Sequence, residues 1–123
     1  VMRNCILVID DEEYIRRMIG FVLEGSGFDV IQAASTKDGL EIMRTSSPDV
    51  ITLDLMMPDQ SGLDLLASKQ ADPKICDIPA IIITAVGFQA DLDKARQLGA
   101  SATLNKPFSQ RQLVDTIRSV LDR

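Results

Sequence analysis

Short apolar runs alternate with longer amphipathic stretches along the whole chain. The first run, at positions 5–9, is continuous and rich in β-branched residues, which is typical of a strand buried on both faces. Later runs have the same character and a similar length. We expect strands at 5–9, 28–33, 50–53, 79–84 and 102–104.

The stretches between these runs carry apolar residues at helical spacing, as Ile15 and Ile19 do in the first stretch. We expect Ser35 or Thr36 to cap the second helix and Ser109 to cap the last one. The pattern predicts helices over 14–24, 36–45, 63–70, 89–98 and 110–121.

This alternation predicts an α/β fold, with a parallel sheet that is covered by helices on both faces. Right-handed crossovers should place the first strand centrally, beside the third. The length of 123 residues fits one domain, so we expect a single domain over residues 1–123. A further domain beyond either end of the chain is left open.

Composition and charge exclude several classes of function. The formal net charge is −5 and no long basic run occurs, so we expect no nucleic-acid binding by this domain itself. The apolar runs are far too short to cross a membrane, and no signal peptide opens the chain. We therefore expect a cytoplasmic protein with no membrane association.

The two cysteines and the absence of histidine limit the types of site that the chain can form. We expect Cys5 and Cys76 to be free thiols in a reducing compartment, because the chain has no CxxC motif. The chain contains no histidine, so a zinc site is not expected. This chain itself also cannot be a phosphohistidine carrier or use a Ser-His-Asp or Cys-His mechanism.

Polar residues follow the ends of four predicted strands. Asp10 and Asp11 come after the first strand and Asp54 after the third, while Thr84 ends the fourth and Lys106 follows the fifth. Ligands of open parallel sheets bind outside the carboxyl ends of the strands. We therefore expect three carboxylates, one hydroxyl and one ammonium to converge at one edge of the sheet.

This set of groups predicts magnesium and phosphoryl chemistry. Clustered carboxylates repel one another, and a divalent cation offsets that repulsion. A set of oxygen ligands without His or Cys favours Mg²⁺. A cation beside a lysine can hold a phosphoryl group, and a carboxylate can be the nucleophile that accepts it. Each residue alone is more often a cap, a turn former or a surface charge, so the combination carries the prediction.

The chain resembles the bacterial two-component response-regulator receiver family over essentially its whole length. The resemblance implies a flavodoxin-like, doubly wound sheet of five parallel strands in the order 2-1-3-4-5, with five helices. The motifs that carry it are Ile9-Asp10-Asp11-Glu12, Asp54-Leu55-Met56-Met57-Pro58 followed by Gly62, Ile83-Thr84-Ala85, and Asn105-Lys106-Pro107-Phe108.

The resemblance implies that Asp54 accepts a phosphoryl group from the phosphohistidine of a sensor histidine kinase or a phosphotransfer protein. Asp11 and Asp54 would bind Mg²⁺ directly together with the backbone carbonyl of Met56, and Asp10 would help through water. Such a protein is a switch rather than an enzyme, with at most slow self-dephosphorylation.

Other residues would bind or report the phosphoryl group. Lys106 would pair with its oxygens, the Thr84 hydroxyl would turn toward it, and the backbone N–H of Ala85 would donate to it. The small side chain of Ala85 would leave the in-line path open. The resemblance also implies a cis peptide bond between Lys106 and Pro107.

Signal output in this family uses the fourth helix, the fifth strand and the fifth helix. The resemblance implies that this face binds an effector domain or a downstream protein, and that any homodimer would form through it; whether the chain dimerises is left open. The candidate residues here are Lys94, Leu98, Leu104, Asn105 and Arg111.

Three positions depart from the pattern that is common in the family. Thr103 stands where many receivers have an aromatic residue, so we expect the signal to pass through residues 86–89 or the fourth helix instead. Met56 and Val86 are apolar at positions where polar residues can help to place the attacking water. They predict slow self-dephosphorylation, although simple loop packing would explain them equally well.

Alternative functions remain open at this stage. A degenerate receiver would act as an interaction module without phosphorylation, and Thr103 gives that alternative some weight. A flavodoxin-like cofactor binder would need a phosphate-binding loop where Asp10 and Asp11 stand. A haloacid-dehalogenase-type phosphatase would need its second aspartate where Glu12 stands.

Overall fold

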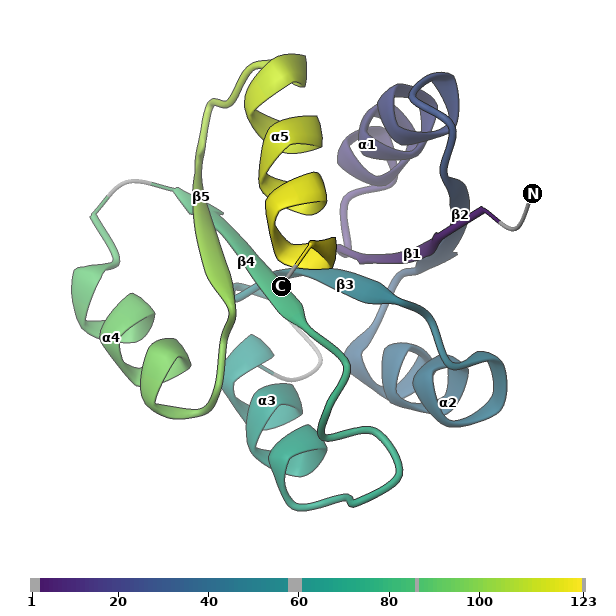
Figure 1. The fold of residues 1–123 in the computed structure, drawn as a ribbon. Helices are drawn as coiled ribbons and strands as arrows, with labels where there is room; N and C mark the ends of the chain where they lie inside the picture. The colour runs from purple at the N-terminus through teal and green to yellow at the C-terminus, as the bar shows by residue number, and fades with distance from the viewer. Residues whose placement is uncertain (1–2, 58–60, 86, 123) are drawn as a thin grey trace.

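A computed structural model describes residues 3–57, 61–85 and 87–122 of the chain. Within these residues, strands and helices alternate as the hydrophobic pattern predicts (Figure 1). The elements are β1 (Cys5–Ile9), α1 (Glu13–Gly25), β2 (Asp29–Ala33), α2 (Thr36–Ser46), β3 (Val50–Asp54), α3 (Gly62–Gln70), β4 (Ala80–Ala85), α4 (Gln89–Gln97), β5 (Ala102–Lys106) and α5 (Gln110–Leu121).

The five strands form one parallel sheet in the order β2-β1-β3-β4-β5, which confirms the predicted fold. Helices α1 and α5 cover one face of this sheet, and α2, α3 and α4 cover the other (Figure 1). Alternate residues of the central strands face opposite sides, so the sheet divides two apolar cores. Ile6 and Val8 pack with α1 and α5, whereas Leu7 and Ile9 pack with α2 and its neighbours.

The capping residues begin the helices as expected. The Ser35 side chain accepts a hydrogen bond from the N–H of Asp38 at 3.1 Å, which makes Ser35 the cap of α2. Ser109 and Gln112 form a reciprocal capping box at the start of α5. These side chains satisfy backbone donors that the first helical turn leaves unpaired.

The register brings the polar strand ends to one edge of the sheet. Asp54 is the last residue of β3 and is paired with Ile83, just before Thr84. The fifth strand is longer than predicted, because Lys106 pairs with Ala85 and so belongs to β5. Strand pairing therefore fixes the position of the Lys106 backbone beside the end of β4.

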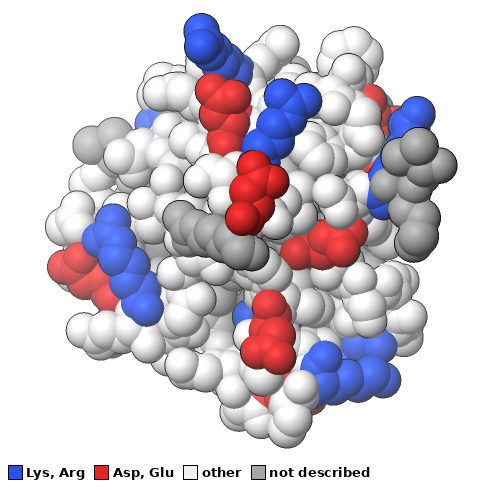
Figure 2. Space-filling model, viewed as in Figure 1, with Lys and Arg blue, Asp and Glu red and all other residues white. Residues whose placement is uncertain are grey.

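The surface carries charges of both signs. Figure 2 shows Lys and Arg side chains lying beside Asp and Glu side chains on the face seen in Figure 1. The Arg44 side chain, for example, donates to the carboxylate of Asp72 at 2.9 Å. Among the described residues, no helix is both long enough and apolar enough to cross a membrane.

Candidate functional site

Three carboxylates meet at the carboxyl ends of β1 and β3. Each of Asp10, Asp11 and Asp54 offers one oxygen, and these oxygens all lie within 4.8 Å of one another. Asp10 and Asp54 are buried, with 2% and 7% of their surface exposed, whereas Asp11 is exposed to solvent. The structure thus brings together the cluster that the strand-end pattern predicts.

Lys106 reaches this cluster from β5, although β4 lies between β5 and β3. Its Nζ lies 3.2 Å from Oδ2 of Asp54 and 3.6 Å from Oδ2 of Asp10. Burial lowers the pKa of Lys106, but the two carboxylates outweigh burial and leave that pKa above its ordinary value. The side chain therefore stays protonated and brings a positive charge to the buried pair.

One lysine does not neutralise the cluster. Burial raises the pKa of Asp10, and the charges of Asp54 and Asp11 raise it further. The N–H of Glu12 and the ammonium of Lys106 lower this pKa, yet the net shift is upward. The 3.6 Å contact with Lys106 is therefore too weak to offset burial and repulsion.

Backbone N–H groups orient the two buried carboxylates. The N–H of Glu12 donates to Oδ1 of Asp10 at 2.9 Å, and the N–H of Met56 donates to Oδ1 of Asp54 at 3.1 Å. Both donors lie two residues beyond the acid that they bind, in the loop that follows the strand. Each loop thus holds one oxygen of its carboxylate, and Lys106 lies beside the other oxygen.

Arg16 is a supporting residue that the sequence pattern did not identify. It lies on α1 and is half-buried, and its Nη1 donates to the backbone carbonyl of Asp10 at 2.8 Å. This bond ties the first helix to the turn that carries Asp10 and Asp11. Spacing alone gives no signal for it, because the contact depends on how the side chain folds back along α1.

Thr84 is fully buried near the end of β4. Among the described residues, its hydroxyl is the buried side-chain oxygen that has no hydrogen-bond partner. Leaving such a group unpaired costs about 1–3 kcal/mol, so a polar ligand atom within reach would be stabilised. Ala85 follows it and is exposed.

Gly62 allows α3 to begin close against the end of β3. A Cβ at this position would lie 2.8 Å from the carbonyl oxygen of Asp54 and 2.8 Å from Cα of Leu55. The Gly62 N–H also donates to the carbonyl of Leu55 at 2.9 Å. The glycine of the motif is therefore required for space beside Asp54.

The positions that depart from the family pattern have different surroundings. The Met56 side chain is 54% exposed, whereas Met57 is buried in the core beside α3, as packing predicts. Thr103 accepts a long hydrogen bond of 3.5 Å from Arg96 of α4. Pro58 and Val86 lie outside the described residues.

The candidates on the output face are only partly exposed. Leu98 and Leu104 are half-buried and pack against the two cores, whereas Lys94, Asn105 and Arg111 are exposed.

The Lys106–Pro107 peptide bond is cis, as the resemblance implied.

The donor set fits Mg²⁺. The described cluster consists of carboxylate oxygens, which are the hard ligands that this ion prefers. Burial raises the pKa of Asp10, and the charges of Asp54 and Asp11 add to this shift, so a divalent cation would favour the ionised carboxylate. The adjacent Lys106 and the unpaired Thr84 hydroxyl suit a phosphoryl oxygen better than a second metal.

The chain is similar to known proteins over most of its length. The family model described as the response regulator receiver domain matches residues 6–118. The phosphate regulon transcriptional regulatory protein PhoB of Pseudomonas aeruginosa is 37% identical over 118 residues, which are 96% of this chain and 52% of that protein. The chain thus spans about half the length of this relative.

Other relatives match over their full length. The polar-differentiation response regulator DivK of Brucella ovis is 30% identical over 120 residues, or 98% of each chain. A putative response regulator from Chloroflexus aurantiacus superposes with a TM-score of 0.94 at 28% identity, covering 99% of this chain and 100% of that one. For the chemotaxis protein CheY4 of Vibrio cholerae the TM-score is 0.91 at 25% identity, with 97% and 99% covered.

Proposed function

Because the chain belongs to the response regulator receiver domain family, we propose that Asp54 is its phosphoacceptor in a two-component pathway. The observation that carries this proposal is the setting of the Asp54 carboxylate. One oxygen accepts from the N–H of Met56, and the other lies 3.2 Å from Nζ of Lys106. Asp54 is thus fixed in orientation and lies beside a cation.

The proposed reaction is a phosphoryl transfer from a phosphohistidine to a carboxylate. A carboxylate oxygen of Asp54 forms a bond to phosphorus while the bond between phosphorus and the histidine nitrogen breaks. The product is an acyl phosphate, and the histidine of the donor leaves as a neutral imidazole once it has taken a proton. This protein supplies the acceptor carboxylate and stabilises the negative charge of the transferred phosphoryl group. In this proposal it is a switch and does not catalyse repeated turnovers as an enzyme does.

Asp11 and Asp54 would hold Mg²⁺ directly with the backbone carbonyl of Met56, and Asp10 would do so through water. When bound, this ion would offset the charge of the carboxylates and of the incoming phosphoryl oxygens. The N–H bond from Glu12 keeps the Asp10 carboxylate turned toward the cluster. The short distances between the three carboxylates support this assignment.

Lys106 and Thr84 would share the new phosphoryl oxygens. The Lys106 ammonium would exchange its contact with Asp54 for one with phosphate, which carries more charge. The Thr84 hydroxyl would gain the partner that it lacks. This new hydrogen bond would favour a form of the protein in which Thr84 faces the phosphoryl group. The backbone N–H of Ala85 would also donate to a phosphoryl oxygen.

The partners follow from this chemistry. This chain would act in the cytoplasm, where a sensor histidine kinase or a phosphotransfer protein would supply the phosphoryl group. The surface of α4, β5 and α5 would carry the output to an effector domain or downstream protein. Family membership favours this function over a flavin-binding or dehalogenase-type one. Thr103 stands where many receivers have an aromatic residue, and its hydroxyl accepts a hydrogen bond from Arg96. For this reason, a phosphorylation-independent interaction module is the second candidate function.

Intact mass spectrometry tests the proposal. The parent protein and its Asp54→Ala variant are incubated with Mg²⁺ and acetyl phosphate. We expect the parent alone to gain the mass of one phosphoryl group, and excess chelator to prevent the gain. An unmodified parent that still binds Mg²⁺ would favour the interaction module.

A further inference from the structure

Lys69 is a buried lysine that the phosphoacceptor site does not use. It lies in the last turn of α3, and only 5% of its surface is exposed. Lysine is rarely buried to this extent unless an acid pairs with it. Within the part of the chain that the structure describes, no carboxylate forms an ion pair with its ammonium. The fold therefore buries a positive charge without an anion in contact with it.

The Lys69 side chain ends at Cys76, in the loop between α3 and β4. Its Nζ donates to the backbone carbonyl of Cys76 at 2.9 Å. Burial lowers the pKa of Lys69, whereas the negative charges of a Cys76 thiolate and of Asp77 act in the opposite direction. The sulfur belongs to the same residue as the bonded carbonyl, so it lies within electrostatic reach of the ammonium.

The Cys76 thiol is partly exposed and only weakly held. Its Sγ lies 3.8 Å from the carbonyl oxygen of Pro73 and 3.8 Å from Oδ1 of Asp77. A thiol is a weak hydrogen-bond donor, so little stability is lost when these contacts change. A small oxidant can therefore reach this sulfur from solvent.

The loop that carries Cys76 is ordered by contacts on both of its sides. Arg44 of α2 donates to the carboxylate of Asp72 at 2.9 Å. Ile75 is buried in the core on the side of α2, α3 and α4. These contacts hold the loop against the body of the protein, so Lys69 and Cys76 stay close together in the folded state.

The other cysteine has surroundings of the opposite kind. Cys5 begins β1, and burial raises the pKa of its thiol. The charges of Asp49 and Asp29 raise this pKa further, so a negative charge on the Cys5 sulfur is disfavoured. The chain thus offers one thiol near a buried cation and one thiol near two acids.

We propose that Cys76 is a site of oxidation by peroxide, and that Lys69 is the counter-ion of the oxidised sulfur. In the first step the O–O bond of hydrogen peroxide breaks and an S–O bond forms, which gives a sulfenic acid and water. A second peroxide oxidises the sulfenic acid to a sulfinic acid and is itself reduced to water. The sulfinic acid releases its proton to solvent, and the sulfinate forms the ion pair that Lys69 lacks.

Asp77 opposes this ion pair, but it is exposed, so solvent and salt screen its charge. The interaction with the buried ammonium is screened much less. The oxidation site lies before the amino end of β4, whereas Asp54 lies at the carboxyl end of β3, at the opposite edge of the sheet. The proposal is therefore independent of phosphoryl transfer to Asp54.

Urea unfolding before and after treatment with hydrogen peroxide tests the proposal. Peptide mass spectrometry first locates the added oxygens, and we expect a sulfinate at Cys76 before one forms at Cys5. The urea midpoint of the parent protein should rise on oxidation, because a buried charge gains a partner. Lys69→Gln can still donate to the Cys76 carbonyl but carries no charge, so oxidation should lower its midpoint.

Further variants separate this effect from oxidation elsewhere. Cys76→Ser, treated in the same way, reports oxidation of Cys5 and of the five methionines, and its midpoint should not rise. Cys76→Asp places a carboxylate near Lys69 without any oxidant. Its midpoint should lie above that of Cys76→Asn, which is its neutral match, and Lys69→Gln should reverse this order. Circular dichroism checks that each variant is folded.

Three results would overturn the proposal. The first is peroxide oxidation of the exposed Met56 that leaves Cys76 reduced. The second is a midpoint that moves in the same direction on oxidation of the parent and of Lys69→Gln, which would show that the lysine charge has no part in the effect. The third is a cross-linked peptide in which the Cys76 sulfur is bonded to Nζ of Lys69, which would replace the ion pair by a covalent bond.

Discussion

Nζ of Lys106 lies 3.2 Å from Oδ2 of Asp54, although 52 positions separate the two residues and β4 lies between their strands. The contact places a protonated amine against the oxygen that would otherwise carry unbalanced charge. It exists only when the whole sheet is formed, because each residue ends its own strand.

Replacing Lys106 by Ala should slow phosphorylation by about 100-fold or more, which is the usual cost of removing a group that stabilises developing charge. The same change should lower the free energy of unfolding in chelator by about 1–3 kcal/mol, because buried carboxylates lose a charged partner. Rates of mass gain with acetyl phosphate and urea unfolding measure the two effects. Lys94→Ala on exposed α4 is the matched control, and an equal loss in that variant would contradict a specific role for Lys106.

Replacing Thr84 by Val should stabilise the unphosphorylated protein by up to about 1 kcal/mol, because a buried hydroxyl without a partner is removed while the shape is kept. Thr36→Val is the matched control, since Thr36 is equally buried but does have a partner, and it should be destabilising. Urea unfolding in chelator compares the two. A clear loss of stability in Thr84→Val would show that the hydroxyl is satisfied.

Replacing Asp10 by Asn should stabilise the metal-free protein at neutral pH. Burial raises the pKa of Asp10 in the folded state. The stability that this shift contributes is complete below the unfolded pKa of 3.8 and is lost as the pH rises through the folded pKa. The advantage of the Asn variant should therefore shrink as pH falls through that raised pKa. Unfolding in chelator across this range measures it, and an advantage that grows on acidification would contradict the assignment.

Replacing Arg16 by Ala should weaken Mg²⁺ binding several-fold. Loss of a positive charge alone would tighten the binding of a cation, so a weaker affinity reports the lost bond to the Asp10 carbonyl. Isothermal titration calorimetry gives the affinity, and Arg16→Lys should recover part of it. Arg17→Ala removes the neighbouring exposed arginine, whose partner is Glu13, and should not weaken binding. Equal effects at Arg16 and Arg17 would rule out a positioning role.

Much of the fold follows from local patterns in the sequence. Buried parallel strands read as continuous apolar runs, so β1 and β4 are evident from composition alone. Since parallel strands end at one edge of the sheet, Asp10, Asp54 and Thr84 could be placed together before any coordinates were known. The end of β5 was predicted two residues too early, because Asn105 and Lys106 are polar and join the strand only through pairing with β4.

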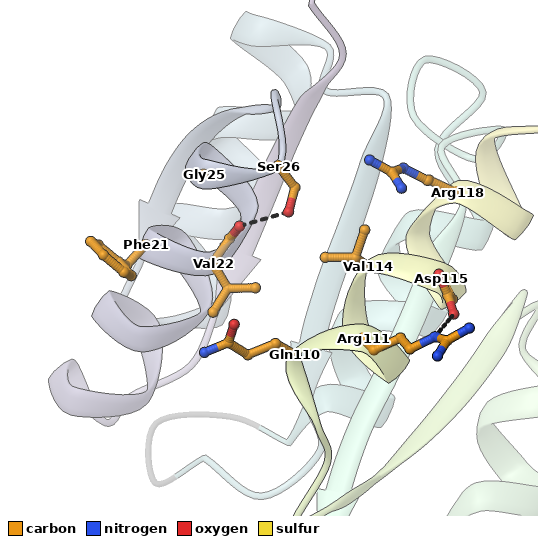
Figure 3. Close-up of a pocket in the computed structure, with 9 residues that line it drawn as sticks. All are labelled: Phe21, Val22, Gly25, Ser26, Gln110, Arg111, Val114, Asp115 and Arg118. Carbon is orange, nitrogen blue, oxygen red and sulfur yellow. Dashed lines mark hydrogen bonds and ion pairs between the residues drawn. The ribbon is translucent and has the colours of Figure 1, made fainter.

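Other features depend on tertiary contacts that no local pattern encodes. The bond from Arg16 to the Asp10 carbonyl requires a particular path of a long side chain. A groove lined by Phe21, Val22 and Val114 lies between α1 and α5, which are far apart in the sequence (Figure 3). Sequence periodicity places Val22 on the apolar face of α1, but it does not show that α5 lies beside this face.

The most direct test of the account locates the phosphoryl group chemically. The phosphorylated protein is reduced with borohydride, which converts an aspartyl phosphate to homoserine, and peptides are then sequenced by mass spectrometry. The account predicts homoserine at position 54 and unchanged aspartate at positions 10 and 11. Homoserine at either of those positions, or intact Asp54 in a protein that has gained a phosphoryl group, would contradict it.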